Sequence, residues 1–278
     1  MATDSVAICN EALLMLGSKT ITALADATDR ARLCNQFYNL ARQTVLRSHP
    51  WNFALKRSRL STYPAGTLTP GALSGNGVTF TASSSVFIAG DVGSLLVGEA
   101  SGNTGIARIV GYTSGTVVTA DIETAFTSVA AIANRSWRIA PGWQWAYRYS
   151  KPSDYLRVWS AEGAGTALRW SWFLRQSMIE GSDPIKIEGQ YLLSDYGPTL
   201  DILYVADITD TTKWEPLFEQ ALATFLAHKL AYGITGKEQT SREFFQLYKM
   251  HLAEARSIDG QEGTPDSPGP DELIAVRF

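Results

Sequence analysis

The sequence is poor in the residues that build metal centres and disulfide frameworks. Its 278 residues include two cysteines, Cys9 and Cys34, and three histidines, His49, His228 and His251. Neither set has the spacing of a zinc site, so no metal is expected. The N-terminus lacks a basic region followed by an apolar core. This predicts that there is no secretory signal and that the chain assembles in the cytoplasm with free thiols.

Long apolar runs and an excess of positive charge are also missing. No run approaches the about 20 apolar residues needed to cross a bilayer, so no membrane association is expected. The net charge of −3 argues against a general DNA-binding protein, because such domains are usually basic. Hydrophobic residues make up 45% of the chain and charged residues 18%, which predicts a packed core in one large or two small domains.

Acids are absent from one long stretch. From position 30 to 59 every charged residue is basic: Arg30, Arg32, Arg42, Arg47, Lys56, Arg57 and Arg59. From position 257 to 278 acids prevail over the single base Arg277: Asp259, Glu262, Asp266, Asp271 and Glu272. The two stretches are either solvated surfaces of opposite sign or surfaces that meet charged partners. On the second interpretation, Arg42, Arg47 and Arg57 are candidate interface residues.

The last residues form a second candidate interface. A segment rich in Gly, Pro and Asp follows Arg256 and is not expected to fold alone. It ends in an apolar cluster that would gain stability by docking on a partner. The cluster and its basic neighbour are Leu273, Ile274, Val276, Arg277 and Phe278.

Apolar residues at helical spacing predict four helices. The first runs near 4–16 and the second near 28–48. The third has Pro216 in its first turn and ends at Gly233, and the fourth begins at Thr240 with a capping box. The stripe of the second helix that faces a core consists of Leu33, Phe37, Leu40, Ala41 and Val45.

Strands are predicted in the middle of the chain. Between 67 and 140, short alternating apolar runs among Gly, Ser and Thr predict a small barrel or sandwich. Aromatics at every second position over 143–149 predict a strand, as does the pattern of Trp51, Asn52 and Phe53. Gly189-Gln190 is expected to turn a hairpin.

These elements predict an α+β protein: a four-helix core packed on an antiparallel β-meander, with an inserted small all-β domain. The core domain is assigned to 1–66 and 141–256. The insert is assigned to 67–140, and an extended C-terminal arm to 257–278.

Two glycine motifs do not fit nucleotide sites. Gly236-Lys237 resembles the end of a phosphate loop, but Glu238 follows in place of Ser or Thr, and Ala231 stands where the first glycine belongs. Gly163-Ala164-Gly165 lacks the third glycine of a dinucleotide fingerprint. A helix end and a turn are the better interpretations, and no cofactor is expected.

Candidate catalytic residues are few. His49 has no Ser or Cys nucleophile in a diagnostic context. Asp195 and Asp201 suit a glycosidase only if their separation fits, and turn aspartates are common. The aromatic segment 143–149 could stack on bases or sugars, although core packing or a subunit contact is favoured. The chain is therefore not expected to be an enzyme.

Several segments, taken in order, match one pattern. Those of the first part are Ile8-Cys9-Asn10-Glu11-Ala12-Leu13, Leu16-Gly17, Asp29-Arg30-Ala31 and Arg47-x-x-Pro50-Trp51-Asn52-Phe53-Ala54. Those of the second part are Pro152-Ser153-Asp154-Tyr155-Leu156-Arg157-Val158, Ile187-Glu188-Gly189-Gln190-Tyr191-Leu192-Leu193 and Pro216-Leu217-Phe218-Glu219-Gln220-Ala221-Leu222-Ala223. Over roughly 1–64 and 141–262 the chain resembles the head-to-tail adaptor family of short-tailed bacteriophages, also called tail tubular protein A.

The resemblance implies a structural virion protein. Twelve copies would form a ring below the portal protein, extend the DNA channel and provide the platform for the tail nozzle protein. The insert would contact tail fibres, spikes or a neighbouring subunit, and DNA would pass through the channel without specific binding. Assembly would take place in the cytoplasm of the bacterial host.

Two other classes remain open. One is a carbohydrate- or receptor-binding tail component with the insert as a lectin, and the other is an enzyme acting on cell-wall glycan. Rings seen by negative-stain microscopy favour the adaptor, whereas binding to a glycan array or clearing of peptidoglycan favours a rival.

Overall fold

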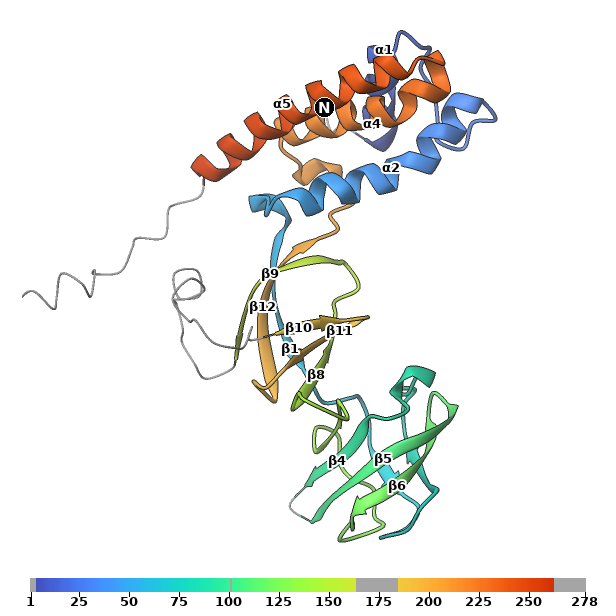
Figure 1. The fold of residues 1–278 in the computed structure, drawn as a ribbon, viewed down its shortest axis with the longest axis vertical. Coiled ribbons are helices and arrows are strands. Elements are labelled where there is room, and N and C mark those ends of the chain that lie inside the picture. The colour runs from blue at the N-terminus through green and yellow to red at the C-terminus, as the bar shows by residue number, and fades with distance from the viewer. Residues whose placement is uncertain (1–3, 101, 164–184, 263–278) are drawn as a thin grey trace, which may run out of the picture. The chain divides into compact units, whose positions relative to one another are not determined.

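The structure, a computed structural model, describes residues 4–100, 102–163 and 185–262. The chain divides into two compact units. The helical unit comprises Met1–Lys56, Asp154–Arg157 and Tyr204–Phe278, and the sheet unit comprises Arg57–Ser153 and Val158–Leu203. Within the described ranges there are four α-helices and twelve strands in three sheets (Figure 1).

Local chemistry sets the ends of the helices. Asp4 caps the first helix and Thr28 the second, each through a side-chain oxygen that accepts a backbone N–H in the first turn. The second helix ends where His49 becomes extended before Pro50. The helices are α1 (Ser5–Met15), α2 (Asp29–Ser48), α4 (Pro216–Thr235) and α5 (Glu238–Glu262).

Helix α4 forms the centre of the helical unit. It packs against α1, α2 and α5, and it is buried along most of its length (Figure 1). Near its start, the Phe218 ring makes edge-to-face contacts with Trp51, Phe53 and Trp214, at centroid distances of 5.2, 5.1 and 5.2 Å. The segment that follows α2 is thus anchored on α4.

Two predicted helix boundaries are wrong. Helix α4 continues past Gly233, which packs against Leu33, and ends before Gly236, whose φ of +67° is the left-handed stop. Helix α5 begins at Glu238, not Thr240, and runs to Glu262. The arm predicted to be extended from 257 is therefore helical over its first six residues.

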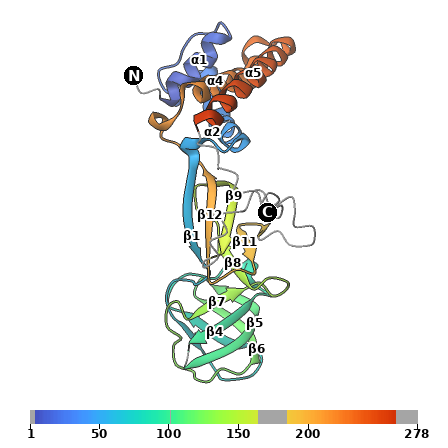
Figure 2. The ribbon, with the colours of Figure 1, turned by 90° about the vertical axis from the view of Figure 1, so that its left-hand side faces the viewer.

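The strands belong to three sheets, with orders β2-β3-β6-β5-β4-β7, β10-β11-β8 and β1-β12-β9. Figure 2 shows β7, β4, β5 and β6 side by side, and β12 between β1 and β9. The strands are β1 (Leu55–Ser61), β2 (Leu68–Pro70), β3 (Val78–Ala82), β4 (Leu95–Ala100), β5 (Asn103–Ser114), β6 (Val117–Thr124), β7 (Trp137–Ala140), β8 (Tyr147–Ser150), β9 (Tyr155–Gly163), β10 (Lys186–Glu188), β11 (Tyr191–Ser194) and β12 (Thr199–Ala206).

The six-stranded sheet curls into a half-barrel around its own core. At one edge, Leu68 and Ile132 exchange backbone hydrogen bonds of 3.1 and 2.7 Å. The largest residues of its core are Leu68, Phe80, Phe87, Leu96, Ile109, Phe126, Ile132, Trp137 and Ile139. This core lies within 68–140.

The predicted architecture of four helices on a single meander, with a closed barrel or sandwich inserted, is wrong. The strands form three sheets, one of them a half-barrel, and the fold is mixed α/β. The four helices find their main packing partners among themselves, not on a sheet. The division of the strands into three sheets depends on pairing between strands far apart in the sequence. Hydrophobic periodicity predicts a strand but does not predict which strand it pairs with.

Two predicted strands are also wrong. Trp51, Asn52 and Phe53 enter a 3₁₀ turn, because the N–H groups of Ala54 and Leu55 both donate to the Trp51 carbonyl. Of the aromatic segment, only 147–149 is in a strand, since Gln144 is left-handed with φ +67° and breaks the alternation. The hairpin turned by Gly189-Gln190 is confirmed, as it joins β10 to β11.

Candidate functional site

Arg42, expected to face a partner, is buried in the helical unit and only 7% exposed. Its Nε and Nη2 donate to the two carboxylate oxygens of Asp207 at 3.1 and 3.0 Å. Gln43 Nε2 donates to the same carboxylate at 2.8 Å. This two-point contact holds the Arg42 guanidinium in one orientation and pairs its positive charge with the carboxylate. Arg42 therefore joins α2 to the residue that follows β12, and its charge is already compensated.

The other predicted interface residues have different positions. Arg47 and Arg57 are exposed, and neither forms an ion pair with a described residue. The tail cluster, consisting of Leu273, Ile274, Val276, Arg277 and Phe278, lies outside the described residues, so its docking stays a prediction.

The acid-free stretch is largely neutralised by acids from elsewhere in the chain. Arg32 pairs with Asp29, Arg42 with Asp207, Lys56 with Asp154 and Arg59 with Asp201. A run of bases in the sequence is thus not a continuous positive surface in space. Arg47 and Arg57 are the exposed cations of this stretch that pair with no acid among the described residues.

A polar network joins the end of α2 to α5. Asp259, 2% exposed, accepts His49 Nε2 at 2.8 Å and the backbone N–H of Asn52 at 2.9 Å. Asn52 Nδ2 donates back to the Asp259 carbonyl at 2.7 Å, and Arg256 Nη2 donates to the Ser48 carbonyl at 2.8 Å. This junction network supplies hydrogen-bond partners to backbone groups between the end of α2 and the start of β1. Its members are Ser48, His49, Asn52, Arg256 and Asp259.

Burial sets the protonation states around the junction network. It lowers the pKa of His49 despite the Asp259 hydrogen bond, so the ring is neutral at pH 7 and its Nε2–H donates to the carboxylate. Burial raises the pKa of Glu215 to about 7, helped by the carboxylates of Asp259 and Glu262. His49 has a partner suited to orienting a base, but its role in this geometry is a contact between two elements.

The two aspartates weighed as glycosidase carboxylates have structural partners. Asp195 accepts the backbone N–H of Ala146 at 3.0 Å. Asp201 accepts Arg59 Nε and Nη2 at 2.7 and 2.8 Å, and this arginine lowers the pKa of Asp201. A general acid needs the opposite shift. Among residues 4–100, 102–163 and 185–262, no group of three His, Cys, Asp or Glu side chains could hold a metal ion.

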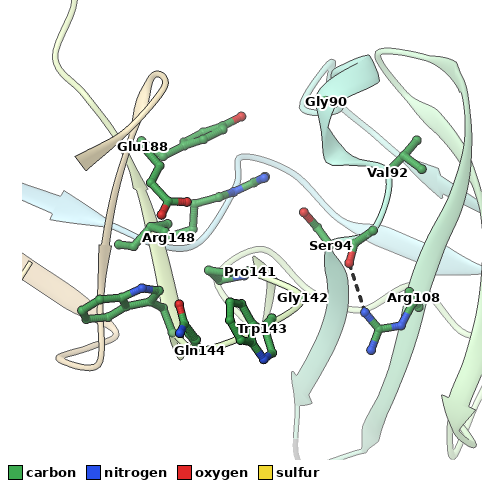
Figure 3. A pocket seen from close by; sticks show the side chains of 14 residues that line it. Gly90, Val92, Ser94, Arg108, Pro141, Gly142, Trp143, Gln144, Arg148 and Glu188 are labelled. Carbon is green, nitrogen blue, oxygen red and sulfur yellow. Dashed lines mark hydrogen bonds between the residues drawn. The ribbon is translucent and has the colours of Figure 1, made fainter. Parts of the chain in front are cut away.

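The sheet unit contains a pocket with a volume of about 560 Å³. Figure 3 shows its two walls: Ser94 and Arg108 on one, Arg148 and Glu188 on the other. Trp143 lies on the connecting segment and is 77% exposed, the largest exposure among the large apolar side chains of the described ranges.

A buried ion pair stiffens the wall that carries Arg148. Arg148 Nη1 donates to Asp91 at 2.7 Å, and Asp91 is fully buried. The Arg148 guanidinium also lies 4.2 Å from the centroid of the Tyr191 ring. On the facing wall, Arg108 donates to the Gly93 carbonyl (Figure 3). It also donates to Glu123. Both arginines are therefore held in place and paired with an acid.

No family model matches this chain, and no curated protein matches it either. The resemblance to the adaptor family thus rests on the segments quoted above. Within the described ranges, no helix is both long enough and apolar enough to span a membrane.

The sequence contained a signal for the junction network that was missed. The buried residues of α5 are Tyr248, Leu252, Ala255 and Asp259, at helical spacing of four, three and four. Asp259 therefore continues the apolar stripe of the helix, and a buried carboxylate with partners could have been expected there. Because Asp259 was grouped with the acids of 257–278, its burial was not predicted.

We expect the unfolding free energy of Glu215→Gln to depend less on pH than that of the parent. In the parent, the folded carboxyl keeps its proton up to about pH 7 and the unfolded one loses it near pH 4.5. The folded state thus binds more protons in this window, and stability falls as pH rises. Allowing for solvent screening of this half-buried group, the difference amounts to about 1 kcal/mol.

Urea unfolding followed by helical circular dichroism at pH 5 and pH 8 measures this effect. Glu254→Gln, an exposed position on α5, is the matched control and should keep the slope of the parent. If the unfolding free energy of Glu215→Gln changed with pH as much as that of the parent, the raised pKa assigned to Glu215 would be contradicted.

Proposed function

We propose that this protein is a ring-forming head-to-tail adaptor of a short-tailed phage virion. It would bind below the portal protein, extend the DNA channel and support the tail nozzle protein. Its action would be assembly, with no bond made or broken, and DNA would pass without specific binding. The ring would hold twelve copies, the number implied by the resemblance.

The observation that best supports assembly is the exposure of Leu40. This side chain belongs to the apolar pattern predicted to face a core, yet it is 56% exposed. Each of the four helices of the helical unit has a large apolar side chain that is more than half exposed: Leu14 on α1, Leu40 on α2, Tyr232 on α4 and Met250 on α5. Single exposed apolar residues are common on monomers, but one on each of four packed helices fits a surface completed by other subunits.

We expect Leu40→Glu to remain a folded monomer that fails to form rings, because a charge at a buried contact costs several kcal/mol when it loses its water. Sedimentation velocity and negative-stain microscopy, on the protein alone and with portal rings, measure assembly. Asn35→Glu, an exposed position on the same helix but about 140° around its axis from Leu40, adds the same charge and should assemble normally.

Two results would count against the proposal. If Leu40→Glu formed rings as well as the parent, Leu40 would not lie in a subunit contact. A parent protein that stays monomeric with portal rings present would remove the adaptor function itself.

A further inference from the structure

The pocket of the sheet unit displays an indole that the fold does not use for its own packing. Trp143 is 77% exposed, whereas Trp137, a few residues earlier, is fully buried in the half-barrel core. An exposed indole is a large apolar face, and sites for small ligands commonly combine such faces with a few fixed polar groups. The volume of about 560 Å³ is typical of such sites.

The polar groups around Trp143 are held before any ligand arrives. Asp91 and Tyr191 fix Arg148, whose guanidinium has N–H donors beyond the one that Asp91 accepts. Gln144, next to the indole, has a left-handed backbone, a conformation that non-glycine residues adopt mostly where surrounding structure imposes it. Figure 3 shows Trp143, Gln144, Arg148 and Glu188 around one opening.

The charges of the pocket select the class of ligand. Each arginine already has a carboxylate partner, Asp91 for Arg148 and Glu123 for Arg108. Glu188 is exposed and forms no ion pair with a described residue, so the pocket offers no uncompensated positive charge to an acidic ligand. An aromatic cage for a cation is also incomplete, because the Arg148 guanidinium occupies a face of Tyr191.

We propose that this pocket binds a neutral hexopyranose unit of a glycan. The C–H face of the sugar stacks on Trp143, and its hydroxyl groups exchange hydrogen bonds with Gln144, Glu188 and Arg148. Carboxylate, amide and guanidinium groups together supply both the acceptors and the donors that hydroxyl groups need. This site goes beyond ring assembly and does not depend on it.

Saturation-transfer NMR on the full chain tests the proposal, with methyl glucoside, methyl galactoside, methyl N-acetylglucosaminide and N-acetylneuraminic acid as probes. We expect transfer to at least one of the neutral glycosides and weaker transfer to the acidic sugar. Trp143→Ala should weaken the binding about tenfold or more, as truncating a stacking ring does. Trp143→Phe, which keeps a ring, should retain part of it.

Tyr112→Ala is the matched control, because this exposed aromatic of β5 lies outside the pocket. It should bind like the parent. Transfer to none of the four probes, or equal binding by Trp143→Ala and the parent, would overturn the proposal. So would preferential binding of the acidic sugar. A parent without sugar binding whose rings are lost in Trp143→Ala would reassign the indole to a subunit contact.

Discussion

Replacing Asp259 by alanine should destabilise the helical unit by about 2–4 kcal/mol, because two hydrogen-bond donors at its buried carboxylate lose their acceptor. The substitution leaves His49 Nε2–H and the Asn52 N–H without an acceptor at a site where Asp259 is only 2% exposed. Unsatisfied buried donors pay their full desolvation cost. Since proteins are stable by about 5–15 kcal/mol, this is a large fraction of the total.

Urea unfolding followed at 222 nm measures the loss, and hydrogen exchange of residues 49–56 locates it. Asp259→Asn should lose less, because its amide oxygen still accepts one of the two donors. Glu254→Ala, on the exposed face of α5, should change stability by less than about 0.5 kcal/mol. An Asp259→Ala protein as stable as the Glu254→Ala control would show that the network does not hold α5 to the end of α2.

The Asp91→Ala variant should lose about 3–5 kcal/mol in the sheet unit. Asp91 is fully buried and accepts both Arg148 Nη1 at 2.7 Å and the Ile88 N–H at 2.9 Å. Without it, a guanidinium that is only 10% exposed is left with no compensating charge. The contact with the Tyr191 ring remains but does not replace the carboxylate.

The pair formed by Arg108 and Glu123 provides an internal comparison, because both side chains are about two-fifths exposed. Glu123→Ala should cost no more than about 1 kcal/mol. Hydrogen exchange of peptides from β4 and β8 reports on the sheet unit alone, which matters because two units need not unfold together. Adding Arg148→Met to Asp91→Ala should recover part of the loss. If Asp91→Ala and Glu123→Ala lose equal stability, the burial of the Arg148–Asp91 pair does not explain its contribution to the stability of the sheet unit.

The features that sequence predicted correctly are those decided by neighbouring residues. The first two helices begin near the predicted positions 4 and 28, where the side chains of Asp4 and Thr28 cap the first turn. Pro216 lies in the first turn of its helix, as predicted, because its missing N–H is not needed there. Gly189 turns a hairpin with a positive φ of 50°. Each of these outcomes depends on a few consecutive residues.

The features that sequence did not predict depend on residues far apart. Asp259 meets His49 across 210 positions, and Arg148 meets Asp91 across 57. The division of the strands into three sheets has the same origin, since alternation predicts a strand but not its neighbour. Leu40 matched a core stripe and is exposed, because periodicity identifies a face without saying what covers it.

The outer edge of β2 limits how two copies of the half-barrel can associate. The backbone of Leu68 already bonds to Ile132, and Pro70, two residues on and directed to the same side, has no N–H to offer. A strand from another chain would find no ladder to extend at this edge, so fusion of half-barrels into a continuous sheet is blocked there. Contacts that another molecule makes at this edge would therefore be made by side chains, and not by the persistent backbone pairing that leads to aggregates.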